Sequence, residues 1–243
     1  MKKYLRDQLI NNVLARDFHH KHDGESVFLI CSGFSAEDKV ADVFNFSNTV
    51  KDVKTFGINL TFKFGRPFDY YFCNFEDYFR TAHYHKEFKE YADRNALFTS
   101  ASCRETSKLA GLEPVGFPIP VIGRNGFSFD LWAGIYNNYL ASIDVLQIMV
   151  AMGFTQIFYI GLDCKFKDGN IVHPYDDFAA QGTEFKQTVV EFERNIRSCE
   201  WIQKLFAKDF PAFKIYNVNP DSAVTAFPKI TLPEAFDLCQ KQS

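Results

Sequence analysis

The sequence lacks the short motifs by which many enzymes are recognised. Its 243 residues contain no Gly-x-Gly-x-x-Gly fingerprint, no Gly-x-Ser-x-Gly elbow and no His-Glu-x-x-His helix. These absences exclude enzymes that bind a dinucleotide through the usual fingerprint, α/β-hydrolases with the nucleophile elbow, and zinc peptidases with the metal-binding helix. No acidic pair has metal-binding spacing, so the sequence predicts neither a bound metal nor another cofactor.

Paired cysteines and long apolar runs are also missing. There is no Cys-x-x-Cys, and no apolar run reaches the ~18 residues of a transmembrane helix. The chain begins Met-Lys-Lys-Tyr without the apolar core of a signal peptide, so we expect a cytoplasmic protein, with peripheral membrane contact left open. Scattered cysteines in such a protein are usually reduced core residues. Three of them end predicted strands, where a pocket-lining thiol is the alternative: Cys31, Cys73 and Cys164.

Basic residues are not in excess. The chain has 27 Lys and Arg against 30 Asp and Glu, a formal net charge of −3. This balance argues against a protein that binds nucleic acid by neutralising its phosphates. It is compatible with a local basic pocket for a single nucleotide.

Apolar and aromatic residues are abundant, at 47% of the chain with 28 Phe. Strand patterns alternate with helix patterns, which predicts an α/β fold: one Rossmann-like domain over residues 1–243, with a doubly wound, mostly parallel sheet and helices on both faces. The predicted strands are 27–31, 50–59, 68–74, 96–99, 154–160 and 213–217. The predicted helices are 3–18, 74–92, 102–109, 137–152 and 183–208, with a short helix opening at Ser35 and a Gly- and Pro-rich loop over 111–125.

Several predicted strands end in a small, amide or acidic residue. Ser32 follows the first, Asn59 and Asn74 follow two others, and Asp163 comes shortly after a strand that stops at Gly161. Because ligands of open α/β sheets bind at the carboxyl ends of the strands, these residues are candidates for one binding rim.

The turn Ser32-Gly33-Phe34-Ser35 joins a strand to a helix. Gly33 would let backbone N–H groups approach an anion, and a helix N-terminus favours negative charge. An ordinary turn with Ser35 as the helix N-cap is the alternative.

The amides of Asn59 and Asn74 would read a ribose hydroxyl, a base edge or a phosphate without adding charge. Simple capping is the alternative for both residues.

Residues 164–182 are polar, irregular and too long for an ordinary turn, which predicts a lid. His173 lies within this segment and is the candidate general base. A solvated loop histidine is the alternative. A metal held by His173, Asp176 and Asp177 would match no defined spacing.

Taken in order, the rim segments resemble the bacterial sialyltransferases of glycosyltransferase family 42. They also resemble the group once called domain of unknown function 115, which includes flagellin-modifying motility accessory factors and archaeal hydroxymethylpterin pyrophosphokinases. The resemblance covers roughly residues 26–228. The segments that carry it are 33–35, 56–59, 69–74, 142–163 and 214–222.

The resemblance implies a pocket for CMP formed by the residues at matching positions: Ser32, Gly33, Ser35, Asn59, Asn74, Asn219, Pro220 and Ser222. The sequence departs from the family pattern in three places. Ser32 replaces the first-loop Asn, residues 138–142 replace an Arg-x-Thr-Ser-Gly run, and Ala-Ala-Gln-Gly-Thr over 179–183 stands where the family has its catalytic His.

We therefore expect a metal-independent transferase that moves a sugar from a nucleotide donor, most readily a CMP-sugar, to a glycan acceptor. Asp163 would complete the pocket and His173 would be the base. Two alternatives remain: a pyrophosphokinase-like transferase that uses ATP and Mg²⁺, and a nucleotide- or sugar-binding protein without catalysis.

Overall fold

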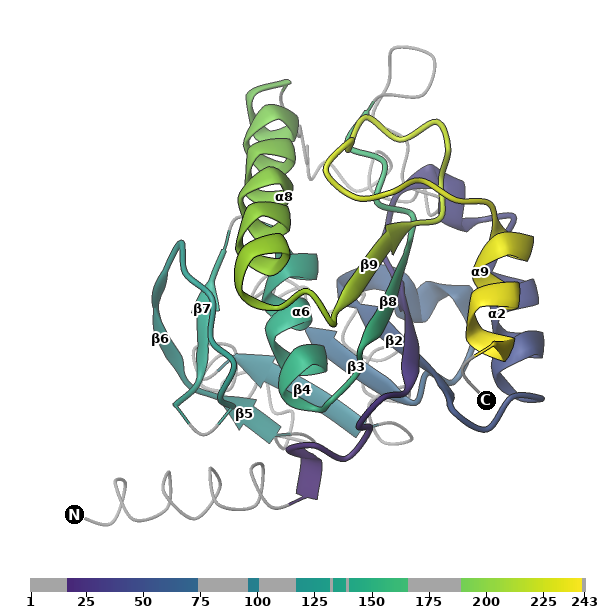
Figure 1. Cartoon of the computed structure of the whole chain (residues 1–243), viewed down its shortest axis with the longest axis horizontal. Helices are drawn as coiled ribbons and strands as arrows, with labels where there is room; N and C mark the ends of the chain where they lie inside the picture. The colour runs from purple at the N-terminus through teal and green to yellow at the C-terminus, as the bar shows by residue number, and fades with distance from the viewer. Residues whose placement is uncertain are drawn as a thin grey trace. The chain divides into compact units, whose positions relative to one another are not determined.

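The computed structural model describes residues 17–73, 96–100, 117–131, 133–138, 140–165 and 189–241. The chain divides into two compact units (Figure 1). The first comprises residues 1–24 and 56–154, and the second comprises residues 25–55 and 155–243. The strand β2 (Val53–Ile58) runs across the boundary. The single domain over residues 1–243 stays a prediction.

Parallel strands form the sheet of the first unit, in the order β5-β4-β3-β2. A separate two-stranded parallel sheet joins β6 to β7. The strands are β3 (Tyr70–Cys73), β4 (Ala96–Ser100), β5 (Phe117–Ile119), β6 (Val121–Arg124) and β7 (Ile135–Asn137). The helical elements are η2 (Asn59–Phe64) and α6 (Ala141–Ala151).

Aromatic rings hold the strands of the first unit together. The ring centroid of Phe56 on β2 lies 5.8 Å from that of Tyr70 on β3 and 6.0 Å from that of Phe98 on β4. Phe18 packs edge-on against Phe98 at 5.1 Å. Because these rings are buried, they supply much of the apolar area that stabilises this sheet.

The helix α6 is buried on nearly every side and ends where Gly153 adopts a left-handed φ of +95°. A Cβ at this position would lie 2.2 Å from Oδ1 of Asp23, so only glycine fits. The buried Gln147 ties the helix to its surroundings, because its Oε1 accepts from the backbone N–H groups of Ser128 and Tyr136, both at 2.9 Å.

The second unit has parallel strands in the order β1-β8-β9, so its described part has the mostly parallel α/β arrangement that the sequence predicts. The strands are β1 (Ser26–Ile30), β8 (Gln156–Ile160) and β9 (Lys214–Asn217). The helical elements are η1 (Phe34–Ala36), α2 (Val40–Ser47), α8 (Val189–Asp209) and α9 (Leu232–Gln240).

Helices lie on both sides of β8 and β9 within this unit, with α8 on one side and α2 and α9 on the other (Figure 1). On the α2 and α9 side, Phe28, Phe158 and Tyr216 stack across the strands at 4.9 Å and 5.4 Å. Phe46 from α2 stacks on Phe236 from α9 at 4.0 Å, and Phe236 packs edge-on against Phe28. This cluster uses four of the 28 Phe residues of the chain.

The structure corrects some predicted elements. Residues 117–119 and 121–124 are strands, although the Gly- and Pro-rich run predicted a loop. The helix predicted from residue 137 begins at Ala141, because residues 135–137 pair as β7. No helix among the described residues is long and apolar enough to cross a membrane. The predicted helices 3–18, 74–92 and 102–109 lie wholly or almost wholly outside the described residues.

The ring stack in the second unit predicts a large stability loss when Phe158 is changed to Ala. Phe158 is fully buried between Phe28 and Tyr216, so its removal leaves a cavity. We expect the free energy of unfolding, measured by chemical denaturation, to fall by about 3–5 kcal/mol. As the control, Val190→Ala on the exposed face of α8 should change it by less than about 0.5 kcal/mol. Equal losses in the two variants would contradict this account of the core.

Candidate ligand site at the ends of three strands

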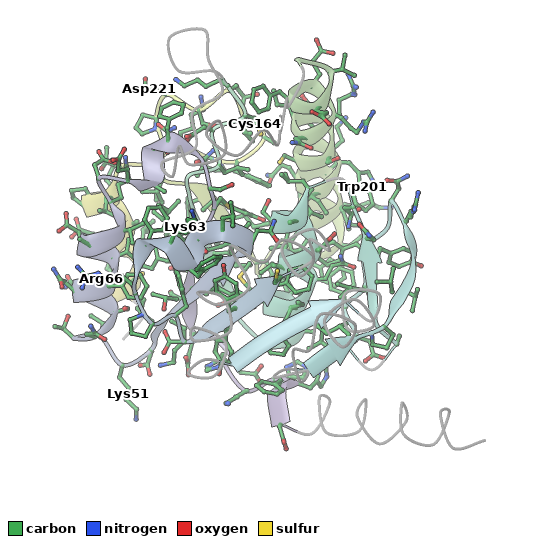
Figure 2. All side chains as sticks on the ribbon, turned by 180° about the vertical axis from the view of Figure 1, so that it is seen from behind. Lys51, Lys63, Arg66, Cys164, Trp201 and Asp221 are labelled. Atoms are coloured by element: carbon green, nitrogen blue, oxygen red, sulfur yellow. The ribbon has the colours of Figure 1, made fainter. Side chains whose placement is uncertain are left out.

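The loops that follow β1, β8 and β9 meet at the carboxyl ends of these neighbouring strands. Gly33 N donates to Gly161 O at 3.0 Å, and Val218 N donates to Tyr159 O at 2.9 Å. Figure 2 places Cys164 and Asp221, from the second and third loops, at one end of the second unit, with Lys51 at the other end. This is the end at which parallel α/β sheets bind their ligands.

One buried carboxylate joins the three loops. Oδ2 of Asp163 accepts from the backbone N–H of Ser35 at 2.9 Å. Oδ1 accepts from the Ser35 hydroxyl at 2.5 Å and from the Asn219 side-chain amide at 2.6 Å. Only 3% of Asp163 is exposed. Burial of a carboxylate is unfavourable without such donors, so the loops and the acid stabilise one another.

The backbone beside Asp163 is held by the loop after β9. The Ser222 hydroxyl donates to Leu162 O at 2.6 Å, and the Asn217 amide donates to the same oxygen at 3.0 Å. The N–H of Ala223 donates to Asp163 O at 2.9 Å. Oδ1 of Asn217 is fully buried and has no hydrogen-bond partner in the described structure. The loop after β8 is thus fixed through both its backbone and its side chain.

Gly33 is required for close packing between loops. A Cβ here would lie 2.2 Å from Gly161 O and 2.5 Å from Oδ2 of Asp163. The sequence suggested instead that this glycine lets backbone N–H groups approach an anion. In the structure the N–H groups of Gly33 and Ser35 donate to Gly161 and Asp163, so a ligand would meet neither without breaking these bonds.

The alternative of an N-cap at Ser35 is wrong. The residue lies inside η1, whose N-cap is Gly33, and α2 begins only at Val40. The Ser35 hydroxyl donates to Asp163, a residue 128 positions away in the sequence. A contact with so distant a residue leaves no pattern in the sequence around Ser35, whereas an N-cap is recognised from its neighbouring residues.

Three lysines belong to these loops or contact them, and the sequence reasoning did not select any of them. Nζ of Lys39 donates to Ser35 O at 2.9 Å, and Nζ of Lys229 donates to Ser222 O at 2.5 Å. Nζ of Lys165 lies 5.8 Å from the centre of the Phe34 ring. The position of Lys165, two residues after the rim acid Asp163, was the signal that could have identified it.

Burial stabilises the neutral form of two thiols in this unit. Burial raises the pKa of Cys164 to about 12, with a further increase from the nearby charge of Asp163. Burial likewise raises the pKa of Cys31 well above its usual range. The thiolate is the reactive form, so a raised pKa disfavours a nucleophilic role for either side chain at neutral pH. All cysteines with described side chains are free, as the sequence predicted for reduced core residues.

The other predicted site residues are placed as follows. Ser32 and the exposed Pro220 lie on the loops after β1 and β9. Asn59 belongs to the first unit, where it begins η2 with a left-handed φ of +50° and its carbonyl accepts from the Tyr71 hydroxyl. Asn74 and His173, with most of the predicted lid, lie outside the described residues. No group of three or more potential metal ligands occurs within the described ranges.

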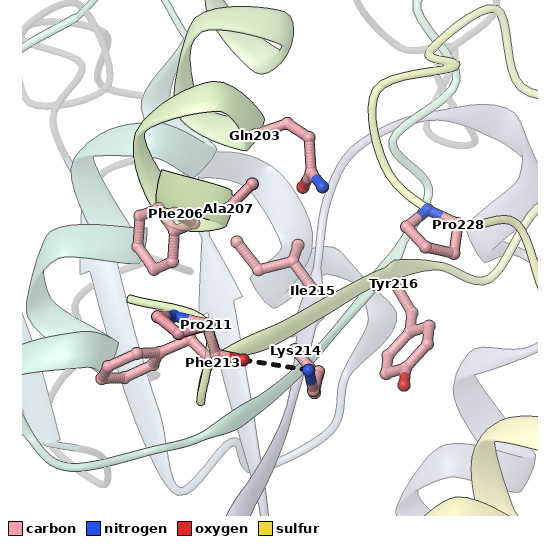
Figure 3. A pocket seen from close by; sticks show the side chains of 9 residues that line it. All are labelled: Gln203, Phe206, Ala207, Pro211, Phe213, Lys214, Ile215, Tyr216 and Pro228. Atoms are coloured by element: carbon pink, nitrogen blue, oxygen red, sulfur yellow. Dashed lines mark hydrogen bonds between the residues drawn. The ribbon is translucent and has the colours of Figure 1, made fainter. Parts of the chain in front are cut away.

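A pocket of about 280 Å³ lies beside β9, between the end of α8 and the segment at Pro228 (Figure 3). Phe206, Phe213 and Ile215 make its wall largely apolar, and Nζ of Lys214 donates to Pro211 O at 2.9 Å. None of the predicted site residues lines it. We therefore place the candidate site at the three loops and not in this pocket.

No family model and no curated protein matches the sequence. Among solved structures, the α-2,3-sialyltransferase Cst-I of Campylobacter jejuni aligns with 85% of this chain and 80% of its own, at 13% identity and a TM-score of 0.48. The sialyltransferase CstII of the same organism, in complex with cytidine-5′-monophosphate, aligns over 86% of both chains at 14% identity and a TM-score of 0.46. CstII in complex with a trisaccharide acceptor and CMP gives 12% identity and the same TM-score. Each of these alignments is a similarity in structure at low sequence identity.

The carboxylate of Asp163 predicts that Asp163→Asn lowers stability. An Asn side chain would direct an N–H group at donors from Ser35 or Asn219 and leave at least one of them unpaired. We expect the free energy of unfolding, from urea titration, to decrease by about 1–3 kcal/mol. Asp221→Asn removes the same charge from an exposed position and serves as the matched control. If Asp163→Asn is as stable as the wild type and the Asp221→Asn control, Asp163 does not hold the loops.

Proposed function

We propose that this protein binds a nucleotide-activated sugar at the loops after β1, β8 and β9 and transfers the sugar to a glycan acceptor. The observation that supports the proposal most directly is the Asp163 network. It holds three loops in one arrangement at the carboxyl ends of parallel strands, where α/β proteins bind nucleotides.

The chemistry of the rim suits an anionic ligand. The donors around Asp163 take up its negative charge inside the protein, so the acid does not need a metal ion to compensate it. The loops carry hydroxyl and amide side chains, which read sugars and bases. The preference for a CMP-sugar comes from the resemblance of Asn219, Pro220 and Ser222 to the positions around CMP in family 42.

In this proposal Asp163 is a positioning residue, because it holds Ser35 and Asn219 and does not face the ligand. Transfer would proceed by attack of an acceptor hydroxyl oxygen on the anomeric carbon. The bond from that carbon to the phosphate oxygen breaks, CMP leaves with the electron pair, and a base takes the hydroxyl proton. His173 is the proposed base.

A ligand panel tests the nucleotide and the metal requirement together. We expect CMP to raise the melting temperature more than UDP, GDP or ATP, with or without Mg²⁺. At 100 times the dissociation constant the stabilisation is about 2.7 kcal/mol, which a thermal-shift experiment resolves. EDTA should leave the CMP shift unchanged. A shift that occurs only with ATP and Mg²⁺ would replace this proposal with the pyrophosphokinase alternative.

The base is tested by His173→Ala. Loss of a general base should lower the rate of sugar transfer from a CMP-sugar by about 10²-fold or more, measured as CMP release in the presence of a glycan acceptor. The affinity for CMP should stay nearly the same. The exposed His20 provides the control variant His20→Ala, which should keep the normal rate. Normal turnover in His173→Ala would show that the base lies elsewhere.

A further inference from the structure

We propose that Lys165 binds the phosphate of the ligand at this site and that the ring of Phe34 holds its ammonium group in place. This inference rests on the proposed function, since it names the residue that would receive the nucleotide phosphate. Nζ of Lys165 lies 5.8 Å from the centre of the Phe34 ring, within the range of a cation–π contact. Phe34 is on the loop after β1, so the contact spans two of the three loops.

The backbone directs Lys165 toward the loop after β1. Cys164 has a left-handed φ of +47°, which is rare for a residue with a side chain. The turn follows directly from Asp163, whose carboxylate is anchored to Ser35 on that same loop. The position of Lys165 is therefore a consequence of the same network that orders the site.

Lys165 differs from the other two lysines at these loops in what its ammonium contacts. Lys39 donates to Ser35 O and to the carboxylate of Asp38, and Lys229 donates to Ser222 O. Both therefore hold backbone carbonyls. Lys165 contacts an aromatic face, and among the described residues no carboxylate lies within 4.0 Å of its Nζ. The described residues thus leave its N–H groups open to an anion.

The two acids described on these loops, Asp163 and Asp221, do not form an ion pair with Lys165. Asp163 accepts its hydrogen bonds from Ser35 and Asn219, and Asp221 is an exposed residue at the edge of the third loop. A lysine ammonium is a compact charge with three N–H donors, which suits a phosphate because its oxygens accept hydrogen bonds from several directions. When the sugar is transferred, negative charge develops on the leaving phosphate, and Lys165 would stabilise it there.

The test compares ligands with and without a phosphate. Binding of CMP, cytidine and pyrophosphate is measured by calorimetry for the wild-type chain, Lys165→Gln, Lys165→Arg and Phe34→Leu. Lys208→Gln, an exposed lysine on α8, makes the same change in net charge and is the control. We expect Lys165→Gln to weaken CMP and pyrophosphate about tenfold, as for a charged hydrogen bond, and to leave cytidine unchanged. Lys165→Arg should retain most of the affinity, and Phe34→Leu should lose part of it.

The outcomes separate this inference from the proposed function. If CMP binds equally to the wild type and Lys165→Gln, the inference is wrong while the nucleotide site stands. If the wild type binds pyrophosphate through Lys165 but binds neither CMP nor cytidine, the phosphate site stands and the proposed nucleotide is wrong. Equal loss of cytidine and CMP in Lys165→Gln would overturn the inference, because it would mean that the variant disturbs the loops.

Discussion

The carboxylate of Asp163 is the interaction on which the arrangement of the candidate site depends. It is buried, and it accepts hydrogen bonds from residues that lie 128 and 56 positions away in the sequence. A buried carboxylate without donors would destabilise the fold. The loops after β1 and β9 are therefore held in contact with the loop after β8 by the requirement to satisfy one charge.

Two further features depend on this contact. Gly33 must be glycine because its neighbours are the Gly161 carbonyl and the Asp163 carboxylate themselves. The backbone of Leu162 and Asp163 must also be fixed, and Ser222, Asn217 and Ala223 provide its partners. Polar side chains of the kinds that bind ligands are thus engaged in hydrogen bonds that hold the loops together. In the proposal above, the ligand is left to residues outside this network, among them Lys165.

The elements of the fold were predicted well where hydrophobic periodicity decides them. The buried strands β1, β3 and β8 lie within a residue or two of their predicted bounds, because a continuous apolar run has few other ways to be buried. The partly exposed strand β9 was also predicted to within one residue. The short strands β5 and β6 were missed because Pro and Gly mark turns in most contexts. In addition, β6 is a strand through its pairing with β7, and such pairing depends on the tertiary structure. The helix predicted at Ser35 was misplaced because the side chain of Ser35 has a distant partner and caps nothing.

The sequence by itself determined the α/β class, the apolar strands and the end of the sheet at which polar residues gather, because these follow from local patterns of apolar and polar residues. It also predicted that Ser35, Asp163, Asn219 and Ser222 lie close together, as their hydrogen bonds show. Only the tertiary structure decided what each of them does. Asp163 anchors loops, Gly33 permits their contact, and Lys165 lies over Phe34 without a carboxylate partner among the described residues. These roles depend on atoms that meet across long separations in sequence, and no local pattern records such distances.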